Sequence, residues 1–488
     1  MKRRVLRLWT RVPLLLVIGL AVFPSDAGAQ AGRQLKAGAS LSNVTPFLDE
    51  VLIGGFGSPV AKYIHDELYA KSLVLDDGET EIALVIVDNL HMVRSVPDAA
   101  RELIEKHTGI KKENVLIAAT HTHSSVSAIK ISEEPSNFDS PAELDEYQRF
   151  LARRIADGVR RAHYAKEPAE IGWGSVQMPQ HVFNRRWFMK PGTDLSNPFG
   201  GQDKVKMNPG VGNPNLDRPA GPTDPEVFFM AVRALDGRPI SLLTNYSLHY
   251  VGGVPGDHVS SDYFGVFSEY FKQLVGGDAK APGFVAMMSN GTSGNINNIN
   301  FRGPAEKMSS YQKMQLVAKD VADNVFKAYQ KMEFKPYVKL GARYSELPLA
   351  VRKPTAQMLE RARKVVADPN IKLLHPLEPA YSGRMIRIQE KWPEKVNAIM
   401  QAIQIGDLAI VGIPFETFVE TGLEIKEKSP FPSTFTISLA NGWYGYLPTP
   451  EHHELGGYET WMGTNYVEVE ATRKITKRLF EQLESMRK

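Results

Sequence analysis

The sequence predicts an α/β protein with a mostly parallel or mixed central sheet, flanked by helices and with its active site at the carboxyl ends of the strands. Short apolar runs rich in β-branched residues, such as Val115–Ala119, alternate with amphipathic stretches of helical spacing. Several of these runs end abruptly in polar residues. Open α/β sheets bind their ligands at such strand ends, so the site is expected there.

The first 29 residues are typical of a secretory signal peptide. Met1–Arg4 is basic, Leu14–Phe23 is a short apolar stretch, and Ala27–Ala29 is a small-residue cleavage site. The apolar stretch is too short to span a bilayer, and no later segment approaches that length. We therefore expect an exported bacterial protein, periplasmic or secreted, whose mature chain begins near Gln30.

Composition narrows the possible functions of this chain. None of the 488 residues is a cysteine, which excludes disulfides, thiolate metal sites and a cysteine nucleophile. The formal net charge of +3 includes the basic leader, so charge indicates neither a nucleic-acid nor a membrane-surface partner. No linker or internal repeat divides residues 30–488, which predicts a single domain. The oligomeric state is not predictable from these features.

The first half of the chain predicts a βαβ unit. Strands at 68–75 and 81–88 flank the turn Asp76–Gly78, a helix follows at 95–107, and Val115–Ala119 is the next strand. A strand–helix–strand unit favours parallel pairing. Further elements are predicted by the same periodicities: helices at 140–166, 263–275 and 308–331, and strands at 169–178, 226–235, 240–248 and 283–288.

The remaining segments are less regular. Residues 179–225 form a long Gly-, Pro- and Asn-rich stretch, which we interpret as a rim over the site because long loops in compact domains are usually functional. The last third predicts a helix at 355–366, one strand at 402–413, a strand running into a turn at 438–445, and a closing helix at 467–486.

Three strand ends carry the residues of a possible metal site. His121 and His123 follow Val115–Ala119, and in extended backbone residues i and i+2 face the same side. His249 follows the strand at 240–248, and Glu416 follows the one at 402–413. In one sheet these ends would converge, and two histidines with a glutamate are a usual catalytic zinc set. The alternative is a polar strand end with ordinary hydrogen bonds.

Four other polar segments have candidate roles, and for three of them two interpretations stay open. The Gly/Asn-rich loop Ser289–Asn298 offers backbone N–H groups for an anion or oxyanion. Gly54–Gly57 fits either a close backbone approach or a plain turn. Asn184–Trp187 fits either contacts to a carbonyl group or an exposed basic pair. The consecutive Glu451–Glu454 is expected to be a solvated surface patch, or else to line the entrance.

Six motifs in the same order resemble the neutral/alkaline non-lysosomal ceramidase family. They span residues 36 to 465: His121-Thr-His-Ser124; Asn184-Arg185; Leu248-His249; Gly283–Ala286 with Gly294–Ile296; Pro414–Thr417; and Asn441–Tyr446 with Thr449 and Tyr458-Glu459. The resemblance implies a zinc amidohydrolase and covers the N-terminal catalytic domain of that family.

The resemblance also implies roles for individual residues. It puts one zinc ion per chain on His121, His249, Glu416 and Tyr446. It gives catalytic roles to His123, Arg185 and Tyr446, with His123 as proton shuttle. We assign substrate contacts to three residues of the Gly/Asn-rich loop, namely Gly294, Asn295 and Asn297.

Two departures from the family pattern shape the expected function. Asn297 stands where the family has a serine, and Ser293 matches only in a shifted alignment, so we expect attack by zinc-bound water. The chain also ends after its final helix, without the family's C-terminal β-sandwich domain. We expect hydrolysis of the N-acyl amide of ceramide or a related lipid. The alternatives are an ester, lactone or carbohydrate N-acetyl group, and a non-catalytic periplasmic binding protein.

Overall fold

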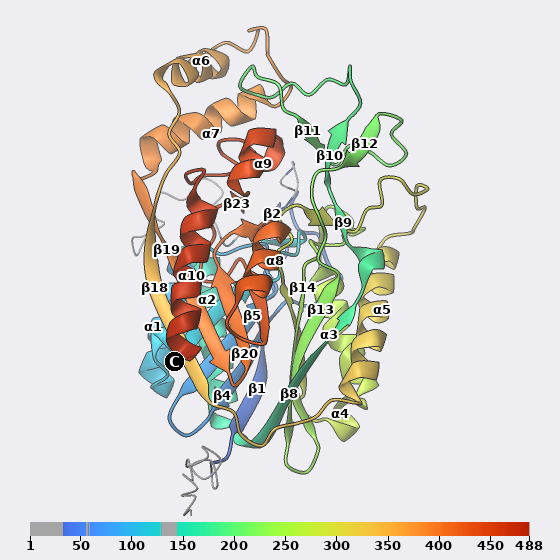
Figure 1. The fold of residues 1–488 in the computed structure, drawn as a ribbon, viewed down its shortest axis with the longest axis vertical. Helices are drawn as coiled ribbons and strands as arrows, with labels where there is room; N and C mark the ends of the chain where they lie inside the picture. The colour runs from blue at the N-terminus through green and yellow to red at the C-terminus, as the bar shows by residue number, and fades with distance from the viewer. Residues whose placement is uncertain (1–32, 55–56, 58, 127, 129–143, 488) are drawn as a thin grey trace, which may run out of the picture. The chain divides into compact units, whose positions relative to one another are not determined.

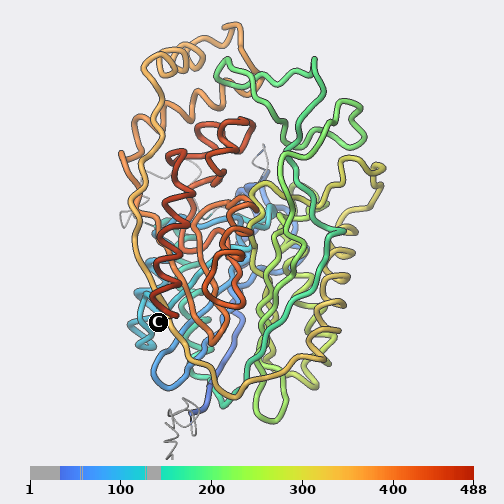
Figure 2. The backbone as a smooth tube through the Cα atoms, in the orientation of Figure 1, coloured from blue at the N-terminus to red at the C-terminus, as the bar shows by residue number. Residues whose placement is uncertain are grey.

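Two β-sheets stacked face to face, with helices on both outer sides, form the protein (Figure 1). This computed structural model describes residues 33–54, 57, 59–126, 128 and 144–487. The leader predicted at residues 1–29 lies outside the described residues, as does the start of the helix predicted at 140–166. In the backbone trace, the first sheet comes from the blue-to-green half of the chain and the second from the orange part (Figure 2).

The first sheet has eight strands in the order β16-β14-β13-β8-β1-β4-β5-β6. Their bounds are β1 Lys36–Asn43, β4 Tyr69–Asp76, β5 Glu81–Val87, β6 Val115–Ala119, β8 Glu167–Gln177, β13 Glu226–Ala234, β14 Pro239–Tyr246 and β16 Val285–Asn290. Only β5–β6 and β14–β16 pair in parallel, and the strands between them are antiparallel. The prediction of a mixed sheet is therefore confirmed and a mostly parallel one is wrong, because tight turns join β4 to β5 and β13 to β14.

The second sheet has four strands in the order β18-β19-β20-β22. Their bounds are β18 Leu340–Ala350, β19 Lys395–Ile405, β20 Leu408–Ile413 and β22 Ser433–Ser438. The single strand predicted at 402–413 is wrong: it is a hairpin of β19 and β20 that turns at Gly406, whose φ is +60°. The turn signal is the pair Gly406-Asp407, which interrupts two runs that are otherwise buried throughout. Likewise, the strand predicted at 438–445 ends at Ser438.

The core fills three layers. Leu84 and Met287 of the first sheet share one cluster with Ile403 and Ile410 of the second. Helices α1 (Ser95–Thr108) and α2 (Glu146–Tyr164) cover the β4–β6 half of the first sheet, and α3 (Asp262–Leu274) and α5 (Gln312–Tyr329) cover its other half. Helices α8 (Val419–Lys428) and α10 (Ala471–Arg487) cover the second sheet. The remaining helices are α4 Gly277–Lys280, α6 Ala356–Ala367, α7 Glu378–Lys391 and α9 Pro450–Leu455, with short η2 Lys112–Asn114, η3 Pro179–His181 and η4 Tyr458–Thr460.

Short strand pairs link the sheets to the loops at one end of the molecule. They are β2 Leu52–Ile53 with β7 Ser125–Val126, β3 Tyr63–Ile64 with β15 His258–Val259, β17 Ile296–Asn297 with β9 Phe183–Asn184, and β21 Glu416–Thr417 with β23 Tyr446–Leu447. The segment 179–225, predicted as irregular, contains a small sheet of β10 Arg186–Met189, β11 Val205–Met207 and β12 Leu216–Pro219. Among the described residues, no helix is both long and apolar enough to cross a bilayer.

Candidate active site

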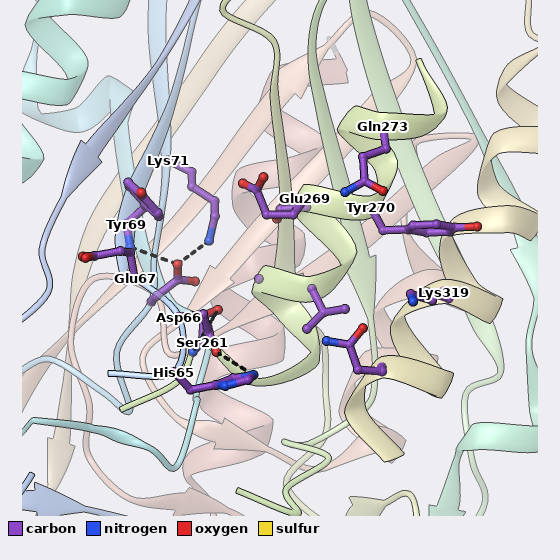
Figure 3. A pocket seen from close by; sticks show the side chains of 15 residues that line it. His65, Asp66, Glu67, Tyr69, Lys71, Ser261, Glu269, Tyr270, Gln273 and Lys319 are labelled. Carbon is purple, nitrogen blue, oxygen red and sulfur yellow. Dashed lines mark hydrogen bonds and ion pairs between the residues drawn. The ribbon is translucent and has the colours of Figure 1, made fainter. Parts of the chain in front are cut away.

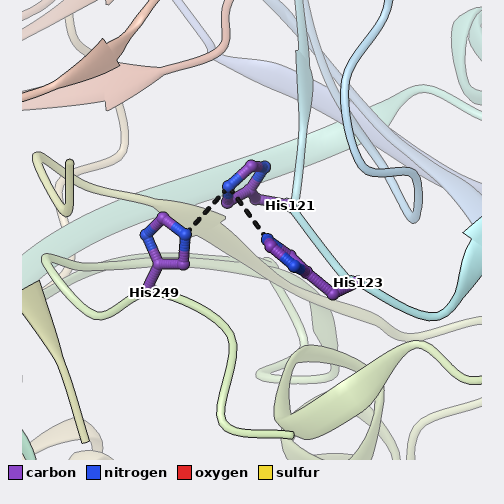
Figure 4. A group of neighbouring side chains, drawn as sticks. All are labelled: His121, His123 and His249. Carbon is purple, nitrogen blue, oxygen red and sulfur yellow. Dashed lines mark hydrogen bonds between the residues drawn. The ribbon is translucent and has the colours of Figure 1, made fainter. Parts of the chain in front are cut away.

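Three histidines meet where β6 and β14 end. His121 Nε2 lies 3.1 Å from His249 Nε2 and 3.3 Å from His123 Nε2, and the three rings point toward one another (Figure 4). His121 and His249 are buried, with exposed fractions of 2% and 1%. The histidine-bearing strand ends therefore do come together, although they are separated by more than a hundred residues in sequence.

The route by which His121 and His123 converge differs from the prediction. The backbone is not extended there, because His121 has a φ of +76°. Such a conformation costs a non-glycine residue of order 1 kcal/mol or more, and the His121 N–H bond to the Asn89 carbonyl holds it in place. His123 then stacks on Tyr250, with ring centroids 3.7 Å apart. The backbone of Gly54 packs directly against His123, which confirms the close approach over the plain turn.

Hydrogen bonds fix the orientation of two of the rings. His121 Nδ1 lies 2.8 Å from the Leu90 carbonyl and His249 Nδ1 lies 3.1 Å from the Ser293 carbonyl, so both Nδ1 atoms donate. A ring in this orientation that is neutral presents its Nε2 lone pair to the other ring, and two such lone pairs 3.1 Å apart repel unless a cation, either a proton or a metal ion, lies between them. Burial, followed by the nearby His121 and Arg185, holds the pKa of His249 well below its usual value. This pair therefore has the form of a metal-ligand pair.

Glu416 adds a carboxylate to the cluster. Its Oε2 lies 3.3 Å from His121 Nε2 and 4.0 Å from His249 Nε2, and its Oε1 accepts a hydrogen bond of 3.2 Å from Trp443 Nε1. Burial raises the pKa of Glu416, but interactions with His121, Tyr446 and Arg185 outweigh it and lower the pKa to about 2. The carboxylate is thus held ionised in a buried position.

Tyr446 and Arg185 complete one side of the cluster. Strand β23 pairs in parallel with β21, which sets Tyr446 opposite Glu416. The Arg185 guanidinium carbon lies 5.3 Å from the centre of the Tyr446 ring. Burial raises the pKa of Tyr446, against the opposing effect of Arg185. Arg185 and Arg186 are buried, so they are not an exposed basic pair.

The donor set fits a metal ion. Zinc bonded to nitrogen at about 2.0–2.1 Å in tetrahedral geometry separates neighbouring ligand atoms by about 3.3 Å. The distances from His121 Nε2 to His249, His123 and Glu416 are 3.1, 3.3 and 3.3 Å. The cluster of His121, His123 and His249 could therefore hold a metal ion, with Glu416 as a further ligand. Which residues complete the ligand set stays a prediction.

The Gly/Asn-rich loop packs against the segments next to the cluster. Gly294 N–H donates to the Thr417 carbonyl at 2.8 Å, and Asn295 Oδ1 accepts from Val419 N–H at 2.9 Å. Asn297 Nδ2 donates to Asn208 Oδ1 at 2.8 Å. The first two contacts tie the loop to the segment that carries Glu416, and the third ties it to the segment 179–225. The assignment of substrate contacts to Gly294, Asn295 and Asn297 stays a prediction.

Ser293 lies on the far side of His249. Its Oγ donates to Asn290 Oδ1 at 2.7 Å and lies 3.3 Å from His249 Nδ1, the nitrogen that faces away from His121. The serine of the shifted alignment is therefore close to the cluster but beside the wrong nitrogen for a nucleophile aimed at the metal position.

Three residues near the cluster had no predicted role. Trp443 hydrogen-bonds Glu416, Glu459 pairs with Arg185, and His91 stacks on Trp443 with ring centroids 4.1 Å apart. Burial, followed by the charge of His121, lowers the pKa of His91 to about 3. Glu459 and Trp443 lie inside motifs of the family resemblance, so they could have been found from the sequence. His91 lies four residues after β5, and no sequence pattern marked it as a site residue.

The segment Glu451–Glu454 is only partly the solvated surface patch that was predicted. Glu451 and Glu454 are exposed, but His452 is buried and its Nε2 lies 2.9 Å from Glu420 Oε1. The segment is helical, as α9, so one of its side chains faces inward.

Two cavities border the histidine segment. One, of about 440 Å³, is lined by His123, Ser124 and Tyr250, by the apolar residues Leu52, Ile53, Pro59 and Val254, and by glycines. The other, of about 440 Å³, is polar and contains Asp66, Lys71 and Ser261 (Figure 3).

The polar cavity helps to hold the histidine segment. Asp66 accepts from Ser261 N–H and Ser260 Oγ, each at 2.6 Å, and the Ser260 carbonyl accepts from Thr122 Oγ1 at 2.6 Å. This wall of the cavity thus supports the residue between the two histidines.

The fold and the cluster together define a mixed α/β protein with a histidine-rich candidate metal site at its strand ends. Residues 35–324 match the family described as neutral/alkaline non-lysosomal ceramidase, N-terminal. The chain belongs to this family, and the predicted resemblance is confirmed. Family membership supports a hydrolase.

Solved structures of ceramidases share the fold. One described as a ceramidase complexed with C2 has a TM-score of 0.68 and 16% identity, and the match covers 93% of this chain and 75% of the other. Neutral ceramidase from Pseudomonas aeruginosa has a TM-score of 0.66 and 17% identity, with the same coverages. At such identities the likeness shows the fold alone.

Proposed function

We propose that this chain is an exported zinc amidohydrolase that cleaves the N-acyl amide of ceramide or a related lipid. The observation that carries the proposal is the Nε2 pair of His121 and His249, held 3.1 Å apart by backbone acceptors behind each ring, with ionised Glu416 beside it. The family match and the cavity next to His123, whose wall includes Leu52, Ile53 and Val254, support an acyl amide with an apolar chain.

The chain's own residues divide the work of amide hydrolysis. His121, His249, Glu416 and Tyr446 would hold the zinc ion. When bound, zinc polarises a carbonyl and makes water acidic enough to attack near neutral pH. Arg185 faces the same region and stabilises negative charge on the carbonyl oxygen. Water adds its oxygen to the acyl carbon, the C–N bond breaks, and a proton reaches the leaving amine.

His123 is the residue proposed to carry that proton. Its Nε2 lies 3.3 Å from His121 Nε2, and it also lines the cavity that contains Leu52, so it stands between the metal position and the substrate space. Among the described residues its buried Nδ1 has no hydrogen-bond partner of good geometry, unlike the Nδ1 atoms of His121 and His249. A ring placed between the metal position and the cavity suits proton transfer.

Metal analysis and a substrate panel test the proposal. Purified protein should contain about one zinc per chain and release fatty acid from ceramides of short acyl length. His121→Ala should abolish both. The matched control is His181→Gln, because His181 is also buried, but its Nε2 bonds Asp320 at 2.7 Å, outside the cluster. Full activity in His121→Ala, or zinc loss in both variants alike, would refute the proposal.

A second substrate class is favoured by one observation. Asn297 stands where the family resemblance implies a serine, and its side chain is engaged by Asn208. An ester, a lactone or a carbohydrate N-acetyl group is therefore included in the panel. Turnover of acylated sugars with inert ceramides would assign this class. A metal-free protein that retains a small ligand would indicate a binding protein.

Export is proposed from the leader sequence. The basic, apolar and small-residue regions of residues 1–29 support cleavage before Gln30. Expression in a bacterial host, followed by fractionation and N-terminal sequencing, should find the chain outside the cytoplasm and starting near Gln30.

A further inference from the structure

A fully buried carboxylate lies behind the candidate site, at Glu459 in η4. Its exposed fraction is 0%, and it bridges two arginines: Oε1 accepts from Arg185 Nε at 2.9 Å and Oε2 accepts from Arg186 Nη1 at 2.7 Å. An unpaired carboxylate would be strongly disfavoured there. Burial raises the pKa of Glu459, but Arg186 and Arg185 outweigh it and the pKa is lowered.

The two arginines differ in what their remaining N–H groups contact. Arg186 Nη2 donates to the Gly456 carbonyl at 2.6 Å, and its guanidinium lies over the Phe418 ring at 5.3 Å. Its contacts are with Glu459 and with the protein's own backbone and core, although its buried Nε, like Arg185 Nη2, has no hydrogen-bond partner among the described residues. They hold the loop between α9 and η4 in place and leave Arg186 turned away from the histidines.

Arg185 has a donor that the protein leaves unused. Among the described residues, its buried Nη2 has no hydrogen-bond partner, while its guanidinium lies 5.3 Å from the Tyr446 ring, beside Glu416. An unmet buried donor costs about 1–3 kcal/mol. What distinguishes this donor is its place beside Tyr446 and Glu416, where a guanidinium N–H suits a carbonyl or carboxylate oxygen.

We propose that Glu459 is a positioning residue that aims Arg185 at the acyl carbonyl oxygen of the bound substrate. By accepting from Nε it fixes the plane of the guanidinium, so that Nη2 faces the site. Arg186 balances the charge of Glu459, so the Arg185–Glu459–Arg186 triad keeps a net positive charge toward the substrate. The role rests on the proposed amide hydrolysis and extends to the carboxylate of the fatty-acid product.

A double-mutant cycle tests whether Glu459 acts through Arg185. Glu459→Gln keeps the size of the side chain but offers an acceptor to only one arginine. We expect kcat to fall about 10–100-fold with little change in KM and an unchanged zinc content. In an Arg185→Met background the same change should lower kcat no further, because the group it positions is gone.

A binding measurement makes the test independent of turnover. The affinity for hexanoate, a short fatty acid, should fall by the same factor in Glu459→Gln and Arg185→Met, as measured by calorimetry. Glu378→Gln is the matched control: Glu378 is also a buried carboxylate, bonded to Arg361 at 2.8 Å, but away from the histidines. It should lose stability without changing kcat or hexanoate affinity.

The outcomes separate this inference from the proposed function. Multiplicative losses of kcat in the double variant, unchanged hexanoate affinity in Glu459→Gln, or an equal loss of kcat in Glu378→Gln would overturn the role of Glu459. If the wild-type chain hydrolyses no amide, the proposed function fails, and the hexanoate measurements still decide whether Glu459 positions Arg185.

Discussion

Replacing Gly294 by alanine should displace Glu416 without removing any polar group. A Cβ at position 294 would lie 2.4 Å from the Glu416 carbonyl oxygen and 2.9 Å from that of Thr417. A carbon and an oxygen need about 3.3 Å, so the Glu416 backbone must withdraw by about 0.9 Å. Metal ligands tolerate about 0.2 Å. We therefore expect metal affinity to fall at least about 10-fold, and activity with it.

Chelator competition on purified protein measures this effect, with urea unfolding of the metal-free protein as the stability check. Overpacking alone should cost about 1–3 kcal/mol. Gly383→Ala is the matched control, because the atom nearest to its added Cβ is 3.7 Å away and the site is a helix interior, where alanine stabilises by about 0.5–1 kcal/mol. If Gly294→Ala binds metal as tightly as the wild type, the close approach of this loop to Glu416 does not position the ligand.

Three further perturbations follow from the contacts around the site. Lys71, which lines the cavity of Figure 3, is the cation paired with Asp88, whose exposed fraction is 0%. Lys71→Met should lower the free energy of unfolding by about 3–5 kcal/mol, as measured in urea, and an unchanged unfolding midpoint would contradict the pairing. Trp443→Phe removes the N–H that Glu416 Oε1 accepts, and its smaller ring also loses part of the stack on His91, so metal affinity should fall about 10-fold and stability should fall as well; equal affinity would show that this bond orients nothing. Burial raises the pKa of Glu378, but the interactions with Arg361 and the Leu374 N–H are larger and lower that pKa. The stability that ionised Glu378 contributes is therefore present above about pH 4.5 and is lost as the pH falls through the lowered pKa. The stability difference between wild type and Glu378→Gln should shrink toward zero in acid, and a constant difference from about pH 7 to 3 would refute this prediction.

The sequence predicted the strand ends better than the sheets that carry them. His121, His249 and Glu416 each follow a buried strand, and this local pattern was sufficient to group them. The pattern did not reveal that Glu416 leaves a second sheet, because β19 and β20 are buried on both faces, as β6 and β16 of the first sheet are. Whether two apolar strands pair in one sheet or stack in two is decided by tertiary packing.

Residues that contact the site from distant parts of the sequence could not be predicted from local sequence patterns either. Glu459 meets Arg185 across 274 positions, and its role depends on a bridge to Arg186 that neither motif implies. Trp443 was visible as part of an aromatic turn, but its N–H bond to Glu416 depends on how that turn packs against β21. The turn at His121 was missed because a positive φ in a histidine is set by the Asn89 contact and not by the residue itself.

Parallel pairing explains why these particular strand ends supply the site. Only three pairs among the two large sheets are parallel: β5–β6, β14–β16 and β20–β22. Parallel strands end at the same edge, so each pair delivers its carboxyl-end loops to one place. His121 follows β6, His249 follows β14, and Glu416 follows β20. The eight-stranded sheet curls so that β16 contacts β4, β5 and β6, which brings His249 to within 3.1 Å of His121, and the stacking of the second sheet brings Glu416 to within 3.3 Å of His121.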